Sequence, residues 1–157
     1  MAQKRPITRE GYEAIKEKIR HLMTVERPKI AKEIAEARAH GDLKENAEYH
    51  SAKDKQGMIE ANLKKLNDAL AHAEVIENFP TSSSLVQFGA RVTYRNLDTD
   101  EVFTWQLVGQ DEADFQANRI SVESPIGKAI IGKNVGESFT IKIPKGMMEI
   151  EILEISF

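Results

Sequence analysis

The sequence predicts an α+β protein, in which an N-terminal antiparallel α-helical coiled-coil hairpin is followed by a small antiparallel β domain with one short helix. Three observations support this prediction: apolar residues recur at helical spacing in the first half, a glycine-containing stretch interrupts them, and apolar and polar residues alternate in the second half. We expect the hairpin at residues 1–78 with its tip at 41–49, a linker at 79–83 and the β domain at 84–157.

Composition limits the class of protein. The chain has 157 residues, 41% hydrophobic and 30% charged, with a net charge of −3 and no cysteine. Without cysteine, disulfide scaffolds and thiolate metal sites are excluded. No apolar run is long enough to span a membrane, and the N-terminus lacks the apolar stretch of a signal peptide. We therefore expect a cytoplasmic protein that has no membrane partner.

The first arm of the hairpin is predicted to begin after Thr8, a suitable N-cap residue. Its apolar stripe advances in steps of three and four residues, as a helix with one buried face requires. The phase of this stripe slips at residues 26–28, where Pro28 lacks a backbone amide proton, so we expect a kink or a short break there. The stripe consists of Tyr12, Ile15, Ile19, Leu22, Met23, Ile30, Ile34 and Ala37.

The second arm shows a heptad seam, with spacings that alternate between four and three residues. Two such arms joined by a few residues fold back on each other, and an arm of about 30 residues is roughly 45 Å long. Because a two-helix hairpin has a single seam, most of its surface stays in water, which suits an extended arm rather than a packed core. The seam residues are Ala52, Gln56, Ile59, Leu63, Leu66, Leu70 and Ala73.

The second half of the chain has the alternation and turn residues of a small β domain. A short helix is predicted after residue 124, with Ser124 as its N-cap and Pro125 at its first position, and it ends at Gly132. Residues 109–115 are interpreted as an acidic loop. The expected strands are residues 86–97, 102–108, 120–122, 138–143 and 147–155.

Asp42 and Glu45 are the candidate functional residues of the tip. They follow Gly41, which can adopt the left-handed turn that ends a helix. The pair fits a cap for the second helix, with Asp42 as N-cap, and this is the interpretation that the residues alone favour. The same carboxylates are hard oxygen ligands for Mg²⁺ or Mn²⁺, although two of them make an incomplete site. A closed zinc site is not expected from the spacing of His40 and His50.

Arg38 and Lys53 flank the tip and could approach each other across the hairpin. Such a basic spot would attract phosphate groups and make binding depend on salt. The simpler interpretation, a pair of solvated helix faces with partners one turn away, is favoured by the residues alone.

Residues 41–50 resemble the tip of the bacterial Gre transcript-cleavage factors in their GreA-type form. The resemblance extends to residues 8–12 and 26–28, and in the second half to residues 108–114 and 120–129. It therefore covers essentially the whole chain.

This resemblance implies a C-terminal domain of FKBP-like fold and a coiled coil that enters the secondary channel of RNA polymerase. It implies that Asp42 and Glu45 help to hold the second Mg²⁺ of the polymerase and position a water molecule. The polymerase then hydrolyses backtracked RNA near its 3′ end, so the factor would be no enzyme on its own. Separately, we expect it to act as a monomer.

Further roles follow from the same resemblance. Arg38 and Lys53 match the basic patch that contacts the extruded RNA, where Lys53 lacks the bidentate fork of an arginine. Glu123, Ser124 and Pro125 match the loop that docks at the rim of the channel, with Glu123 where related members carry aspartate.

Three other functions fit parts of the sequence. A non-cleaving competitor for the same channel would depart from the family at the tip, and the intact carboxylate pair argues against it. A plain coiled-coil adaptor leaves the charge at the tip unexplained. A prolyl isomerase or chaperone could line a proline pocket with aromatic side chains, although such residues more often form a core. These aromatic residues are Phe103, Trp105, Phe115 and Phe139.

Overall fold

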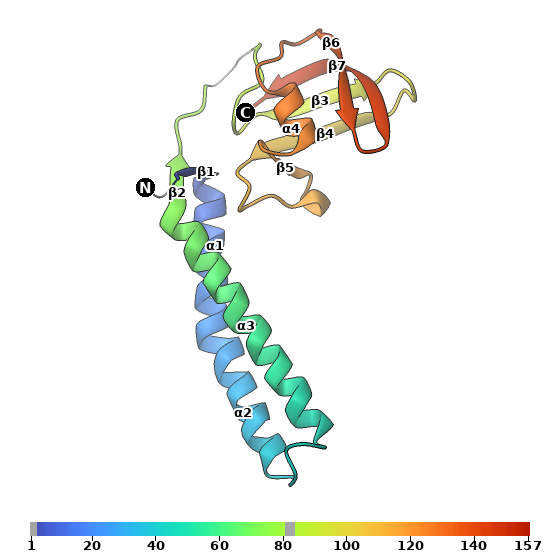
Figure 1. The fold of residues 1–157 in the computed structure, drawn as a ribbon. Coiled ribbons are helices and arrows are strands. Elements are labelled where there is room, and N and C mark those ends of the chain that lie inside the picture. Colours follow the sequence, from blue (N-terminus) through green and yellow to red (C-terminus); the bar gives the residue numbers. More distant parts are fainter. Residues whose placement is uncertain (1–2, 81–83) are drawn as a thin grey trace. The chain divides into compact units, whose positions relative to one another are not determined.

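The computed structural model describes residues 3–80 and 84–157 (Figure 1). Contacts divide the chain into two units, one formed by Tyr12–His72 and the other by residues 1–11 together with 73–157. The first is a long helical hairpin and the second contains a curled mixed sheet, so the predicted α+β class is confirmed. Residues 81–83 of the predicted linker lie outside the described residues, and the predicted domain boundaries stay a prediction.

The first arm of the hairpin runs through α1 (Arg9–His21), the π-helical segment η1 (Leu22–Glu26) and α2 (Arg27–Arg38), and the second arm is α3 (Ala47–His72). Helices α2 and α3 pack along each other (Figure 1). No helix in the described part of the chain is long and apolar enough to cross a membrane.

Thr8 caps α1 as predicted. The amide of Gly11 donates to the Thr8 hydroxyl oxygen at 3.0 Å, which satisfies one of the amides that a helix leaves unpaired at its start.

The irregularity predicted at residues 26–28 is a widened turn rather than a break. Pro28 stands in the first turn of α2, where its missing amide proton costs little, and η1 directly precedes it. Within η1 the Thr24 hydroxyl donates to the Arg20 carbonyl at 2.7 Å, a contact that bends helices. Because a π-helical turn holds extra residues, it absorbs the phase slip in the apolar stripe.

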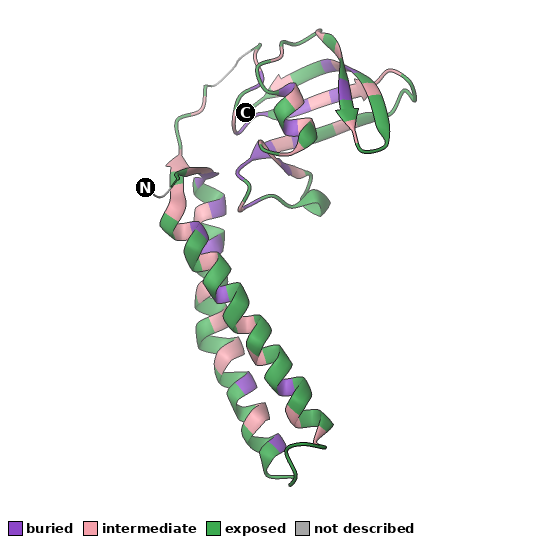
Figure 2. Ribbon diagram, viewed as in Figure 1, coloured by how far each residue is buried: buried purple, intermediate pink, exposed green. Residues whose placement is uncertain are grey.

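The seam between the arms is buried where the two periodic patterns predict it (Figure 2). Two predicted positions are wrong. Met23 is 47% exposed because it lies in the π-helical turn, and Ala73 lies beyond the end of α3. The buried seam residues include Ile15, Ile30, Ala37, Ala52 and Leu63, and Ala69, which is not in the predicted seam, is buried as well.

Strands β1 (Arg5–Thr8) and β2 (Ala73–Ile76) flank the hairpin in the sequence and pair in parallel, from Arg5 opposite Ala73 to Thr8 opposite Ile76. This pair is absent from the sequence prediction. Four-residue strands carry too little alternation to be recognised, and parallel partners so far apart in the chain leave no local turn signal.

Among the described residues of the second half, five strands form one sheet in the order β5-β4-β3-β7-β6. Neighbouring strands are antiparallel except β4 and β5, which are parallel, so the prediction of a purely antiparallel sheet is wrong at this edge. The chain crosses back between them through a loop that contains the short 3₁₀ helix η2 (Phe115–Ala117). The strands are β3 (Arg91–Asn96), β4 (Val102–Val108), β5 (Arg119–Ser121), β6 (Ser138–Ile143) and β7 (Gly146–Ser156).

The predicted strand at residues 86–97 is shorter in the structure. It begins at Arg91, because Gly89 turns the chain with a φ of +88° just before it. The remaining strands differ from their predicted bounds by about one residue at each end, as is usual for strand assignments.

The core of the second unit lies between the sheet and helix α4 (Pro125–Ile130). Of the four aromatic residues considered for a proline pocket, Trp105 is buried, Phe103 and Phe139 pack against the core, and Phe115 is 72% exposed. The Phe115 ring covers Trp105, with ring centroids 4.9 Å apart. The core interpretation is therefore confirmed for three of these residues and wrong for Phe115.

Candidate functional site

The tip of the hairpin is a loop that joins α2 to α3, and it carries both candidate carboxylates. Asp42 and Glu45 are exposed and line one shallow hollow together with His40, Asn46 and Glu48. The structure therefore brings the two predicted carboxylates to a common, solvent-facing site within the hairpin unit.

Gly41 ends the first arm as predicted. Its φ of +120° is a conformation that residues with a side chain rarely adopt. The last carbonyls of α2 accept hydrogen bonds from the turn, Ala37 from the His40 amide at 3.2 Å and Arg38 from the Gly41 amide at 3.4 Å.

The interpretation of Asp42 as the cap of the second helix is wrong. Helix α3 begins at Ala47, and the Tyr49 amide donates to Asn46 Oδ1 at 3.0 Å, so Asn46 is the capping residue. Asparagine caps about as well as aspartate. The Asp42 carboxylate instead accepts the Lys44 amide at 3.0 Å, inside the loop. Both carboxylates thus precede the helix rather than start it.

Two side chains from the start of α3 tie the loop down, and sequence reasoning missed both. Asn46 Nδ2 donates to the Ala37 carbonyl at 2.6 Å, and His50 Nε2 lies 2.9 Å from the Lys44 carbonyl. Because a carbonyl only accepts, His50 Nε2 carries the proton. The position of Asn46, directly before the second periodic segment, was the signal that could have identified it as the cap.

The tip offers two oxygen ligands, which are too few to hold a metal ion by themselves. Mg²⁺ prefers six oxygen ligands, and Asp42 with Glu45 offers carboxylates of the right hardness. In the described ranges 3–80 and 84–157, no three histidine, aspartate or glutamate side chains lie close enough to hold a metal ion. An ion bound by Asp42 and Glu45 would need its remaining ligands from another molecule.

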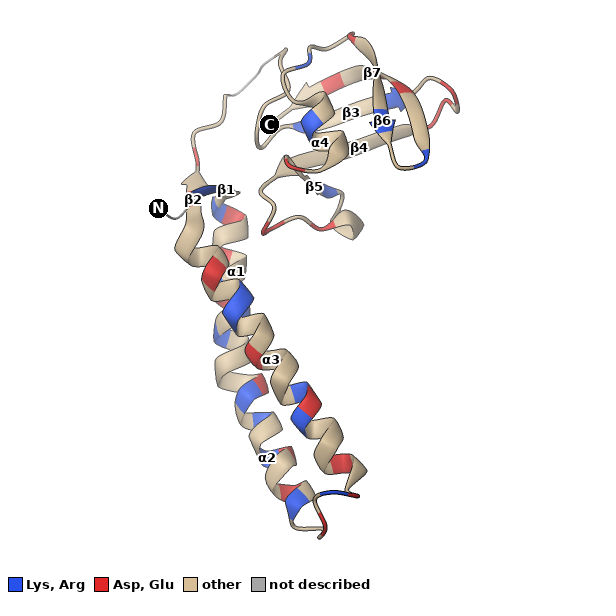
Figure 3. Ribbon diagram, in the orientation of Figure 1, with Lys and Arg blue, Asp and Glu red and all other residues tan. Residues whose placement is uncertain are grey.

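Basic and acidic residues lie along α2 and α3 (Figure 3). Arg38, the last residue of α2, and Lys53, on α3, are both exposed. Each directly follows a buried seam residue, Ala37 or Ala52. On an α-helix, each residue is rotated by about 100° from the one before it. In an antiparallel pair, this rotation away from the seam leads to the same face on both helices, so the two side chains lie on one face. Lys53 Nζ also donates to Gln56 Oε1 at 3.0 Å.

The opposite side of the seam has a different character. A groove there is lined by Glu33, Glu36, Glu48 and Lys55, and neither Arg38 nor Lys53 contributes to it. The lining of this groove is therefore mainly acidic, and the basic patch at Arg38 and Lys53 stays a prediction.

Residues 123–125, the predicted docking loop, lead into α4. Ser124 caps this helix as predicted, accepting the Gly127 amide at 3.0 Å, and its hydroxyl donates to the Ser121 carbonyl at 2.6 Å. Since the hydroxyl is engaged within the domain, the surface offered by this loop consists of the exposed Glu123 and Pro125. A Cβ at Gly127 would lie 2.2 Å from the Ser121 carbonyl oxygen, so this packing requires glycine.

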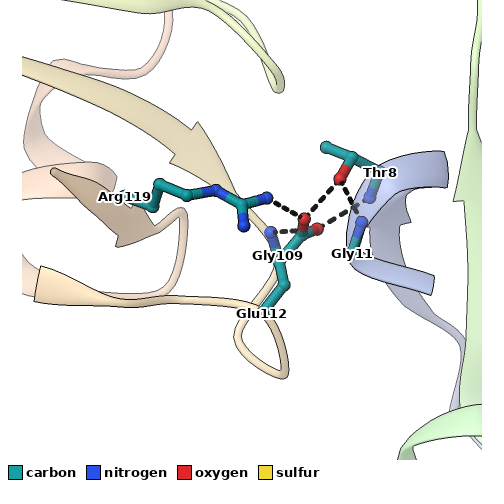
Figure 4. A network of polar contacts seen from close by, with 5 residues as sticks. All are labelled: Thr8, Gly11, Gly109, Glu112 and Arg119. Atoms are coloured by element: carbon teal, nitrogen blue, oxygen red, sulfur yellow. Dashed lines mark hydrogen bonds and ion pairs between the residues drawn. The ribbon is translucent and has the colours of Figure 1, made fainter. Parts of the chain in front are cut away.

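A buried carboxylate, Glu112, lies in the loop that was interpreted only as acidic (Figure 4). Its oxygens accept the Thr8 amide at 2.7 Å, the Gly109 amide at 3.0 Å, Arg119 Nη2 at 2.6 Å, and the Thr8 hydroxyl. A Cβ at Gly11 would lie 2.3 Å from Glu112 Oε1, so the close approach also depends on glycine. The network joins residues at the N-terminus to the loop after β4.

Comparison with protein-family models gives two matches that together span nearly the whole chain. Residues 5–75 match the model described as transcription elongation factor, N-terminal, and residues 81–157 match that described as transcription elongation factor, GreA/GreB, C-term. The chain belongs to the GreA/GreB family.

Members of the GreA/GreB family resemble this chain over its full length. Two proteins named transcription elongation factor GreA, from Thermodesulfovibrio yellowstonii and Syntrophotalea carbinolica, are 50% and 46% identical over 157 residues, covering 100% of this chain and 99% of each relative. Among solved structures, the GreA factor homolog 1 (Gfh1) of Thermus thermophilus is 25% identical, with a TM-score of 0.45 over 99% of this chain and 100% of that chain.

Proposed function

We propose that this chain is a transcription elongation factor that binds RNA polymerase and stimulates the polymerase's own cleavage of backtracked nascent RNA. The observation that carries the proposal is the pair Asp42 and Glu45 in one exposed hollow at the end of a long hairpin. Membership of the GreA/GreB family supports it. The factor would work in the cytoplasm as a monomer and would have no hydrolytic activity alone.

The dimensions of the hairpin suit insertion into the secondary channel of the polymerase. Helix α3 has 26 residues, which corresponds to about 39 Å at ~1.5 Å per residue. Because the two arms pack on each other along the seam, they need no further packing partner to stay helical, and their outer faces stay in water. They would carry the tip loop to an active centre that lies deep inside another protein.

Asp42 and Glu45 are the residues that would hold the second Mg²⁺ jointly with the polymerase. When bound between enzyme and substrate, that ion would supply an activated water and stabilise charge on the attacking and leaving oxygens. The two carboxylates would raise its occupancy and orient the water toward the phosphodiester. Their incomplete ligand set is what a shared site requires, because the partner contributes the remaining oxygens.

Two other surfaces would complete the interaction. Arg38 and Lys53, on one face of the hairpin, would contact phosphates of the extruded RNA near its 3′ end. Glu123 and Pro125, at the start of α4, would dock at the rim of the channel while Ser124 keeps the helix start in place.

Cleavage of RNA by a stalled, backtracked polymerase in Mg²⁺ tests this function. We expect the wild-type chain to shorten the RNA, and Asp42→Asn or Glu45→Gln to reduce the rate by about 100-fold or more, as loss of a charge-stabilising group does. Melting and helicity should not change, because Asn46 caps α3.

Asp54→Asn is the matched control, since it makes the same exchange at an exposed position of α3 outside the loop. It should cleave like the wild type. If the wild-type chain binds the polymerase without producing shortened RNA, the cleavage function is excluded and the competitor for the channel takes its place.

A further inference from the structure

Asn46 and His50 hold the tip loop through hydrogen bonds to the backbone carbonyls of Ala37 and Lys44. We propose that Asn46 and His50 are positioning residues, which fix the loop so that Asp42 and Glu45 face the same hollow before the factor meets its partner. This inference rests on the proposed function for its purpose, although the contacts themselves belong to the free chain.

Asn46 joins the end of one arm to the start of the other. Its Oδ1 accepts the Tyr49 amide at 3.0 Å, and its Nδ2 donates to the Ala37 carbonyl at 2.6 Å. Ala37 is buried in the seam, with 3% of its surface exposed, so the anchor point belongs to the packed part of the hairpin. Only an amide side chain of this length offers a donor and an acceptor at once, because aspartate lacks the donor and serine lacks the reach.

His50 acts on the other side of the loop. Its Nε2–H donates to the Lys44 carbonyl at 2.9 Å, and the Lys44 amide donates to Asp42 Oδ1 at 3.0 Å. The Lys44 residue is thereby held at both its carbonyl and its amide. The His50 ring also contacts Tyr49 edge to face, with ring centroids 5.6 Å apart. One chain of contacts thus runs from α3 through Lys44 to the Asp42 carboxylate.

For catalysis, what matters is the fraction of molecules in which the tip loop has the productive conformation. An exposed loop without these ties samples many conformations, and the productive fraction multiplies the rate directly. A loop that is already ordered loses little freedom on entering the partner, so the carboxylates arrive in place. Loss of one tie should therefore lower cleavage by roughly 3- to 10-fold, the factor expected for a single hydrogen bond.

Asn46→Ser and Asn46→Asp distinguish the hydrogen bond to the Ala37 carbonyl from the cap of α3. Both residues cap helices well, so α3 should keep its helicity. The aspartate carboxylate has no donor, and the serine hydroxyl is too short to reach the Ala37 carbonyl. His50→Phe removes the other donor and keeps a ring beside Tyr49. Asn67→Ser, the same exchange at an exposed position of α3, is the control.

Two measurements test the variants. The first is ¹⁵N relaxation of the free chain, where we expect the order parameters of the Lys44 and Glu45 amides to fall from about 0.8 to below ~0.6 in the three tip variants and to stay unchanged in Asn67→Ser. The second is RNA cleavage, where the rate at saturating factor should fall while the factor concentration needed for half-maximal rate stays the same.

Unchanged order parameters in the tip variants would overturn the inference. So would a disordered loop that cleaves at the wild-type rate, or a drop in helicity that accounts for the whole loss. If the wild-type chain shortens no RNA, the proposed function fails by itself, while the relaxation measurement on the free chain still decides whether these side chains order the loop.

Discussion

At the level of single residues, the buried Tyr94 links the stability of the sheet domain to alkaline pH. Tyr94 is 2% exposed and its hydroxyl oxygen accepts Trp105 Nε1–H at 3.1 Å. Burial raises the pKa of Tyr94, and the Trp105 hydrogen bond opposes this only in part. The folded chain therefore keeps the phenol proton to higher pH than the unfolded chain does. This contribution is complete below the unfolded value of about 10 and is lost as pH rises through the folded pKa.

Unfolding in urea between pH 8 and pH 11 checks this prediction with Tyr94→Phe. The variant should lose stability less steeply above pH 10 than the wild type. At neutral pH it should be weaker by about 1–2 kcal/mol, because the Trp105 indole N–H loses its acceptor inside the core. Parallel losses in both proteins at high pH would show that another group controls the alkaline transition.

The sequence predicts a capping residue correctly where a helix start offers a single candidate. It does not predict a side chain whose hydrogen-bond partners lie far away in the chain. Thr8 and Ser124 cap their helices as expected. At the tip, Asp42 and Asn46 are both good caps, and the first helical residue decides between them. Glu112 was not recognised because its partner Thr8 lies far away in the chain, and no local pattern connects them.

At the level of elements, the seam of the hairpin should account for most of the stability of the two arms. Leu63 on α3 is 3% exposed, so Leu63→Ala removes buried methyl groups and leaves a cavity, at a cost of about 2–4 kcal/mol. Met58 on the same helix is 67% exposed, and Met58→Ala should change stability by less than about 0.5 kcal/mol. Thermal unfolding followed by far-ultraviolet circular dichroism measures both. Similar losses for the two variants would mean that the seam is not what holds the arms together.

Periodicity was enough to predict the long elements, because helical arms and alternating strands repeat their signal over many residues. Short elements lack that repetition. Strand β5, with three residues, gave no indication that it would run parallel to β4, and β1 and β2 were not recognised at all. Pro28 correctly marked an irregular helix, but whether it would break or widen depended on the neighbouring turn.

At the level of the whole molecule, the sequence predicted the order of a helical hairpin followed by a sheet domain, and the family matches cover both parts. The contacts assign residues 1–11 to the same unit as the sheet, although they precede the hairpin. A sequence read from one end to the other cannot show this, since the assignment depends on pairing between remote segments.

The parallel pairing of β1 with β2 has a consequence for folding kinetics. The pair can form only by closing a loop that contains the entire hairpin, and such non-local contacts carry an entropic cost that local helix contacts avoid. We expect the arms to associate before the transition state and the two strands to join after it. Ile7 in β1 is 2% exposed, so Ile7→Ala should accelerate unfolding in stopped-flow experiments and leave the refolding rate nearly unchanged, a φ-value near zero. A slower refolding rate in this variant would place strand closure early. If the strands close late, the start of the hairpin is held in place only when β2, which follows the hairpin, pairs with β1, which precedes it.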